Sequence, residues 1–109
     1  MEIRFSERVY KKLQLVPKGR VTTYKELAAA IGTTAYRSVG TALKNNPYAP
    51  EVPCHRVVAS DGSIGGFKGK TQGKEIDEKM MMLEQEGIHI KNNKIGDFDR
   101  TLFRFSKSL

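Results

Sequence analysis

Two short helices separated by a glycine are the feature that most restricts what this chain can fold into. Thr23 and Glu26 match a capping box, in which a hydroxyl and a carboxylate satisfy free backbone amides at a helix start. The apolar residues that follow end at Gly32, a residue type common at helix C-termini. A second helix is predicted over residues 34–44, before Pro47 stops it. Its apolar stripe is Ala35, Val39, Ala42 and Leu43. The pair predicts a helix-turn-helix unit.

The other segments predict a mixed α/β domain that is mainly α. Phe5, Val9 and Leu13 recur at helical spacing and form one face of a first helix. Three prolines lead into a short strand predicted near residues 52–59, and Asp61-Gly62 marks a turn. A last helix is predicted over residues 75–86. Its inward residues are Ile76, Met80 and Leu83, with Gly87 as C-cap, and a tail with Leu102, Phe103 and Phe105 follows. We expect a winged helix-turn-helix-like fold with a short strand or hairpin near the cysteine.

The composition fits one soluble globular domain over residues 1–109, because 39% of the residues are hydrophobic and 28% are charged. No apolar run approaches the ~18 residues of a membrane-spanning helix. The first residues do not resemble a signal peptide. The single cysteine excludes an intrachain disulfide and suits a reducing compartment. We therefore expect an intracellular protein with no membrane partner.

Basic residues are concentrated in the first two thirds of the chain. Residues 1–74 carry 13 Lys and Arg against 5 Asp and Glu, whereas residues 75–109 carry 6 against 7. The isoelectric point is about 9.7. This asymmetry indicates a polyanionic partner such as DNA, because neutralising phosphates releases condensed counterions. A solvated basic surface without such a partner explains the charge equally well.

The only cysteine lies beside one of the two histidines, in residues 53–58 (PCHRVV). A thiol with the ordinary pKa of about 8.5 needs a base or a positive charge nearby to react at neutral pH, and His55 or Arg56 can supply either. Neighbours on an extended segment point to opposite faces. We therefore expect a relay from Cys54 to His55 through water or a bend, not a direct hydrogen bond. The alternative is a buried cysteine that acts as a small hydrophobe.

The hexapeptide resembles the active-site signature of the O6-alkylguanine-DNA alkyltransferases, which move an alkyl group from guanine O6 in DNA onto their own cysteine. Further segments resemble this family in order and spacing, from about residue 5 to residue 87. They are residues 21–28 (VTTYKELA), 37–40 (RSVG), 46–47 (NP), 65–67 (GGF) and 83–87 (LEQEG). The resemblance implies DNA repair by one irreversible transfer per molecule, with no cofactor and no metal.

The resemblance also implies roles for individual residues. Cys54 is the nucleophile and alkyl acceptor, His55 is its base through a water molecule, and Glu86 orients His55 and balances its charge. Asn46 ties the recognition helix to the active-site turn. The implied substrate pocket consists of Val57, Gly65 and Phe67.

A guanine stacked in duplex DNA keeps O6 beyond the reach of a buried thiol, so the base must be extruded. The resemblance assigns this step to Tyr24, which presses on the adjacent phosphate, and to Arg37, which fills the vacated stack from the minor groove. Ala35 and Gly40 are small enough for close approach to the groove. The implied DNA-binding set is Tyr24, Arg37, Ala35, Gly40 and Arg56. We expect a monomer that binds double-stranded DNA carrying O6-alkylguanine.

The sequence departs from the family pattern in several places. Phe67 stands where many members carry a tyrosine, and Tyr36 is bulkier than the alanine often found there. The stretch from Phe67 to the last helix is longer than in compact members. The family's usual N-terminal domain is absent from residues 1–109. In length the chain resembles alkyltransferase-like proteins that bind lesions without transfer, in which a tryptophan typically replaces the cysteine; Cys54 argues against that subclass.

Two alternatives to the enzyme stay open. One is a lesion sensor that recruits other repair proteins, and the other is a basic helix-turn-helix regulator with an incidental cysteine. Stoichiometric modification of Cys54 distinguishes the enzyme from both.

Overall fold

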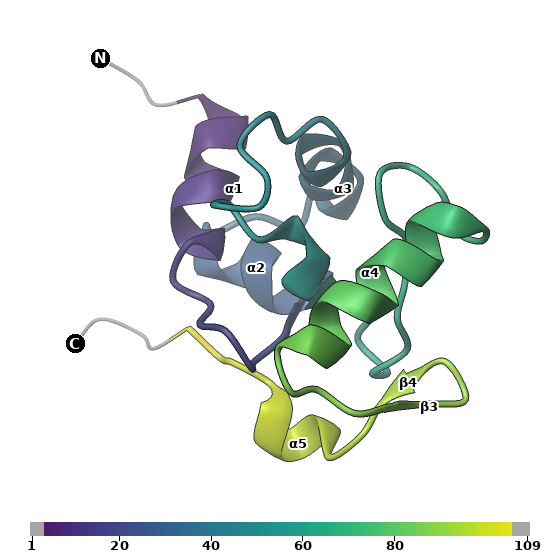
Figure 1. Ribbon diagram of the computed structural model, residues 1–109. Coiled ribbons are helices and arrows are strands. Elements are labelled where there is room, and N and C mark those ends of the chain that lie inside the picture. Colours follow the sequence, from purple (N-terminus) through teal and green to yellow (C-terminus); the bar gives the residue numbers. More distant parts are fainter. Residues whose placement is uncertain (1–3, 106–109) are drawn as a thin grey trace.

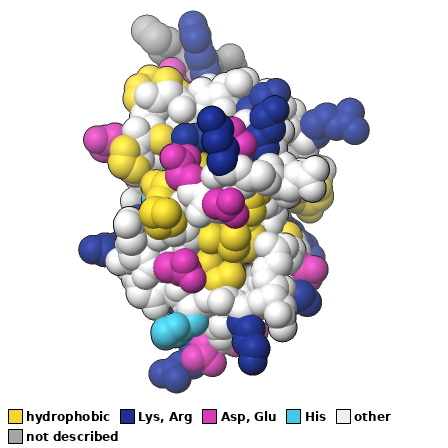
Figure 2. Space-filling view, turned by 45° about the vertical axis from the view of Figure 1, so that its right-hand side comes forward, with side chains coloured by type: hydrophobic (Ala, Val, Ile, Leu, Met, Phe, Trp, Pro, Cys, Tyr) yellow, Lys and Arg dark blue, Asp and Glu magenta, His cyan; other side chains and the backbone are white. Residues whose placement is uncertain are grey.

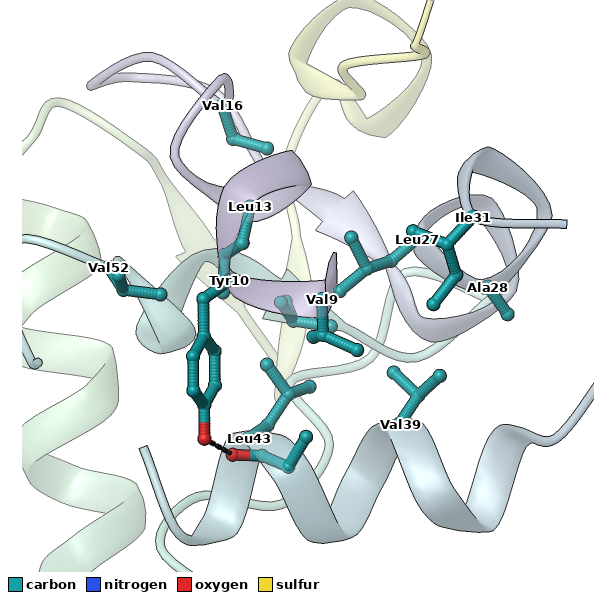
Figure 3. Packing of buried hydrophobic residues seen from close by; sticks show 12 residues of the cluster. Val9, Tyr10, Leu13, Val16, Leu27, Ala28, Ile31, Val39, Leu43 and Val52 are labelled. Carbon is teal, nitrogen blue, oxygen red and sulfur yellow. Dashed lines mark hydrogen bonds between the residues drawn. The ribbon is translucent and has the colours of Figure 1, made fainter. Parts of the chain in front are cut away.

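Three helices of the N-terminal half pack on one another around the first of two hydrophobic cores (Figure 1). The computed structural model describes residues 4–105. Val9, Leu13, Leu27 and Val39 meet in this core (Figure 3) and are fully buried. The Tyr10 hydroxyl donates to the Ala42 carbonyl at 2.7 Å, which fixes the first helix against the third (Figure 3). The helices are α1 (Phe5–Leu13), α2 (Tyr24–Ala30) and α3 (Tyr36–Lys44).

The predicted helix-turn-helix is confirmed by α2 and α3. The Thr23 hydroxyl accepts from the Glu26 amide at 3.0 Å, as one half of a capping box requires. The Glu26 carboxylate instead faces Arg104 at 3.8 Å. Gly32 follows α2 with a φ of +74°, a left-handed conformation that favours glycine. Helix α3 begins two residues later than predicted, because Ala35 is its exposed N-cap and not part of the buried stripe.

The cysteine segment corrects the predicted strand over residues 52–59. Cys54–Arg56 forms a short 3-10 helix, η1, and only β2 (Val57–Val58) is extended. The Arg56 amide donates to the Pro53 carbonyl at 2.9 Å, and this local turn replaces sheet pairing. Strand β2 pairs in parallel with β1 (Thr22–Thr23), Thr22 opposite Val57. The cysteine turn is thereby attached directly to the start of α2.

The C-terminal part forms α4 (Lys74–Gln85), which packs against η1, and three elements that the sequence did not predict. Ile76 and Leu83 face inward as predicted, but Met80 is only half-buried and Lys79 takes the fully buried position. The additional elements are β3 (Ile90–Lys91), β4 (Lys94–Ile95) and α5 (Phe98–Thr101), of which β3 and β4 form an antiparallel hairpin (Figure 1). The fold is mainly helical with two small strand pairs, as expected.

A second core lies between α4, the glycine loop (residues 62–73) and the C-terminal hairpin, and includes Ile64, Leu83 and Ile95. In Figure 2 several Lys and Arg side chains gather on the upper part of the face and others lie along its lower edge, with Asp and Glu side chains interspersed. Within residues 4–105, no helix has the length and apolar character needed to span a membrane.

Candidate active site

Cys54 lies at the junction of the two cores, at the first position of η1. Its half-buried side chain packs against residues of both hydrophobic clusters. A pocket of about 370 Å³ opens beside it, within the size range of small-molecule sites. The pocket walls come from α2, α3 and residues 66–71. Five residues singled out from the sequence line it, namely Tyr24, Arg37, Gly40, Cys54 and Phe67.

His55 and Glu86 are brought together by the packing of α4 on η1. His55 is 2% exposed, and its Nε2 lies 2.9 Å from Glu86 Oε2. Arg56 binds the same carboxylate with two hydrogen bonds, from Nε to Oε1 at 2.9 Å and from Nη2 to Oε2 at 2.8 Å. Its Nη1 donates to the Val16 carbonyl at 2.8 Å. Such paired, charge-assisted bonds hold the carboxylate rigidly, so Arg56 orients Glu86 as Glu86 orients His55.

The protonation of this group suits a base. Burial lowers the pKa of His55 below its ordinary value, against the opposing effect of Glu86. Burial would raise the pKa of Glu86, but hydrogen bonds from Arg56 and His55 outweigh it and hold that pKa below its ordinary value. At neutral pH Glu86 is therefore ionised and His55 is neutral. Because a carboxylate only accepts, His55 Nε2 carries the hydrogen and Nδ1 is left as the proton acceptor.

No hydrogen bond joins the Cys54 thiol to the His55 ring in the described part of the chain, in line with the expectation that any link is indirect. The backbone reason differs from the predicted one. The two residues lie on a 3-10 turn whose next member, Arg56, donates its amide to the Pro53 carbonyl. The two side chains leave this turn in different directions, His55 toward Glu86 and Cys54 toward the pocket.

Asn46 connects the end of α3 to the segment that enters the active-site turn. Its Nδ2 donates to the Val52 carbonyl at 2.8 Å, and its Oδ1 accepts from the Tyr48 amide at 2.9 Å. The Cys54 amide in turn donates to the same Val52 carbonyl at 2.9 Å. One backbone oxygen therefore accepts hydrogen bonds from both Asn46 and Cys54. The role of Asn46 in tying the recognition helix to this turn stays a prediction.

The groups implied in base extrusion line the Cys54 pocket. Tyr24 is half-buried, and its hydroxyl lies 3.4 Å from the Gly66 carbonyl. Burial raises the pKa of Tyr24, so the phenol stays protonated. Arg37 is exposed on α3 and lines both the Cys54 pocket and a neighbouring hollow between α1 and α3. A Cβ atom built on Gly40 would meet nothing within 4 Å, so its small size is not required by packing within the chain.

Several predicted residues lie outside the pocket walls. Val57 is fully buried in the first core, and Ala35 lies at the start of α3. Gly65 packs against the Tyr24 ring, because a Cβ atom built on Gly65 would lie 3.6 Å from Tyr24 Cε2. The Arg56 side chain is 15% exposed and is committed to Glu86 and Val16. Its contact with DNA stays a prediction, whereas its contact with Glu86 is part of the site.

Lys79 is the residue of the site that sequence reasoning missed. It is 0% exposed, and its Nζ donates to the carbonyls of Val57, Ile64 and Gly66 at 2.7, 2.5 and 2.9 Å. These bonds tie β2, which follows the cysteine turn, to the glycine loop. Burial lowers the pKa of Lys79 to about 7. Its position between Ile76 and Leu83, on the inward helical face, was the available signal.

Comparison with known proteins agrees with this geometry. The family model described as 6-O-methylguanine DNA methyltransferase, DNA binding domain, matches residues 4–88. A methylated-DNA–protein-cysteine methyltransferase of Methanosarcina barkeri is 42% identical over 85 residues, which are 77% of this chain and 52% of that protein. The chain thus spans about half the length of the curated relatives it matches.

Several solved structures resemble the fold. Mycobacterium tuberculosis OGT in complex with DNA superposes with a TM-score of 0.67 at 39% identity, over 79% of this chain and 51% of that chain. Schizosaccharomyces pombe Atl1, bound to damaged DNA containing O6-carboxymethylguanine, superposes with a TM-score of 0.76 at 27% identity, over 95% of this chain and 99% of that chain. Because the family model spans most of its length, this chain belongs to the 6-O-methylguanine DNA methyltransferase family through the DNA-binding domain of that family.

Proposed function

We propose that this chain repairs DNA by transferring an alkyl group from guanine O6 to the sulfur of Cys54. The observation that carries the proposal is a half-buried thiol on the wall of a base-sized pocket, next to a buried His–Glu pair. In the reaction the sulfur–carbon bond forms as the carbon–O6 bond breaks, and the guanine leaves with a proton. The thioether product has no ready route back, so each molecule acts once.

The thiol must lose a proton before it attacks. His55 supplies the acceptor through Nδ1, with one water molecule between that nitrogen and the sulfur. The ionised Glu86, held by Arg56, stabilises the imidazolium that forms. The protonated His55 can then return the proton toward the departing guanine. Asn46 keeps the turn that carries the thiol in register with α3.

The substrate is an O6-alkylguanine nucleotide turned out of duplex DNA into the pocket. Helix α3 approaches the DNA by its exposed face, on which Ala35 and Gly40 leave room. Arg37 takes the place of the extruded base, and Tyr24 presses the backbone outward. Phe67, 5% exposed at the pocket, offers a ring for stacking but no hydroxyl to bind the base. Because the substrate is DNA and the reactive thiol must stay reduced, the protein acts inside the cell.

A lesion sensor that binds without transfer is the second candidate. The likeness to S. pombe Atl1, which covers nearly the whole of both chains, favours it. Cys54 favours the enzyme, because a sensor has no need of a nucleophile beside an oriented histidine. A sequence-specific regulator requires base-edge contacts that distinguish one undamaged site, and each such contact supplies roughly 1–3 kcal/mol of discrimination.

Mass spectrometry after incubation with duplex DNA containing O6-methylguanine tests the transfer. The wild-type chain should gain one methyl mass on the peptide that holds Cys54, and Cys54→Ser should bind the same DNA without any gain. A wild-type chain that binds the lesion stoichiometrically and stays unmodified would establish the sensor. An undamaged sequence that outcompetes the lesion duplex would establish the regulator.

The roles in extrusion are tested separately with a free nucleobase. Arg37→Ala should slow transfer from duplex DNA far more than the reaction with free O6-benzylguanine, because only the duplex carries an unstacking cost of a few kcal/mol. Equal losses on the two substrates would refute the assignment.

A further inference from the structure

A tight turn over residues 67–70 forms one wall of the Cys54 pocket. The amide of Phe67 donates to the Lys70 carbonyl and the amide of Lys70 donates to the Phe67 carbonyl, each at 2.9 Å. Lys68 and Gly69, with φ of 53° and 79°, both adopt the left-handed conformation that a two-residue turn of this kind requires. The backbone of this turn is therefore well defined, and its lysines project from a fixed base.

The tip of the turn packs on the last turn of α3. A Cβ atom built on Gly69 would lie 2.9 Å from Lys44 Cε and 3.1 Å from Lys44 Cδ. The apolar stem of Lys44 therefore runs across Gly69, and Lys44 lines the pocket together with the turn. This contact places the recognition helix and the glycine loop on either side of one opening.

The opening is strongly positive. Lys44, Lys68, Lys70 and Arg37 line the pocket, and none of the residues that line it is acidic. The three lysines are exposed. Lys68 also lies 2.8 Å from Glu78, but both side chains are about half exposed, so solvent keeps this pair weak and exchangeable.

We propose that Lys44, Lys68 and Lys70 form a cationic rim that binds the backbone phosphates flanking the extruded nucleotide. The inference rests on the proposed function and deepens it. A base that enters the pocket leaves its sugar and phosphates at the opening, where the rim lies. Ammonium groups bind phosphate as point charges, without reading the sequence. The rim therefore holds any extruded nucleotide, and the pocket behind it selects the alkylated base.

The test compares Lys68→Ala/Lys70→Ala with a matched control, Lys91→Ala/Lys94→Ala. The control removes two exposed lysines from the β3–β4 hairpin, outside the pocket lining. Binding to duplexes containing O6-methylguanine is measured across a salt series, and alkylation of Cys54 by free O6-benzylguanine is measured in parallel. The free nucleobase carries no phosphate, so it reports on the pocket and the thiol alone.

The rim variant should bind lesion DNA about tenfold more weakly at low salt, with a log-log salt slope less steep by about 1.8, as expected for two lost phosphate contacts. Its reaction with O6-benzylguanine should fall by less than its binding to lesion DNA, since that substrate carries no phosphate and releases no counterions. Lys68→Arg/Lys70→Arg should restore both affinity and slope. The same loss in the control variant, or an unchanged slope in the rim variant, overturns the proposal.

The outcome is separable from that of the proposed function. If the wild-type chain binds lesion DNA but Cys54 is alkylated by neither substrate, the proposed transfer is contradicted. The salt slopes of binding still test whether the rim binds phosphate. A wild-type chain that binds no DNA overturns both.

Discussion

Replacing Gly40 with alanine should stabilise the protein and weaken its binding to DNA. Gly40 lies at the centre of α3, has ordinary helical geometry, and faces open space, since an added Cβ would meet nothing within 4 Å. A glycine in a helix interior costs free energy that no contact within this chain recovers. The proposed function explains its presence, because α3 must approach DNA closely on this face.

The two effects have different sizes. Glycine in a helix interior is about 0.8–1.0 kcal/mol less favourable than alanine. For a domain of about 100 residues, a gain of this size raises Tm by about 4 °C. A methyl group forced into a close-packed contact costs about 1–3 kcal/mol. In the complex with DNA this corresponds to a Kd about 5- to 150-fold higher.

For Gly40→Ala, urea unfolding measures the change in stability and DNA titration of the same preparation measures the change in Kd. Gly32→Ala is the matched control for stability, because that position also faces open space but has a φ of +74°. It should lose about 1 kcal/mol where Gly40→Ala gains it. If Gly40→Ala binds lesion DNA as tightly as wild type, this face of α3 does not contact DNA closely. If it is less stable than wild type, the space around Gly40 is occupied in solution.

Three further substitutions or conditions test the fold and the site. Thr23→Ala should lower the free energy of unfolding by about 1 kcal/mol, because the cap of α2 is lost, and urea unfolding should show it. Glu86→Gln should cost roughly 3 kcal/mol at pH 7, since the mostly buried Arg56 loses its charge partner, and should slow alkylation of Cys54 by O6-benzylguanine. The pKa of Glu86 is lowered, so this stabilisation should disappear as the pH falls through that pKa; a loss that persists in strong acid contradicts the charge pairing. Burial lowers the pKa of Lys79 to about 7, whereas an unfolded lysine has a pKa of about 10.4, so the unfolded state binds more protons between these values. Three donor bonds from Nζ require the charged ammonium, and the neutral amine that forms above the lowered pKa keeps only two. Stability should therefore rise from about pH 7 to about pH 10 in wild type but not in Lys79→Met. A flat wild-type curve in urea unfolding would show that the three carbonyls keep Lys79 charged over this range.

Local patterns in the sequence were enough to predict the features that depend on neighbours along the chain. The cap at Thr23 and the glycine at position 32 located α2. Helical spacing identified one face of α1 and located α4 to within one residue. The hexapeptide around Cys54 and its resemblance to a known family led to Glu86 and Asn46, which the structure places next to His55 and the cysteine turn. Such signals are readable because caps, turns and amphipathic faces are decided by local backbone geometry.

Features that join segments distant in sequence could be seen only in the folded chain. Three contacts join parts of the chain that local patterns cannot relate. They are the pairing of β1 with β2, the two hydrogen bonds from Arg56 to the Glu86 carboxylate, and the contact of Lys44 with Gly69. Lys79 is the clearest case. A lysine is a poor candidate for a buried position, and it is accepted here because β2 and the glycine loop present three carbonyls at one point. The free energy of burying its charge depends on those partners, and their convergence is a property of the folded chain alone.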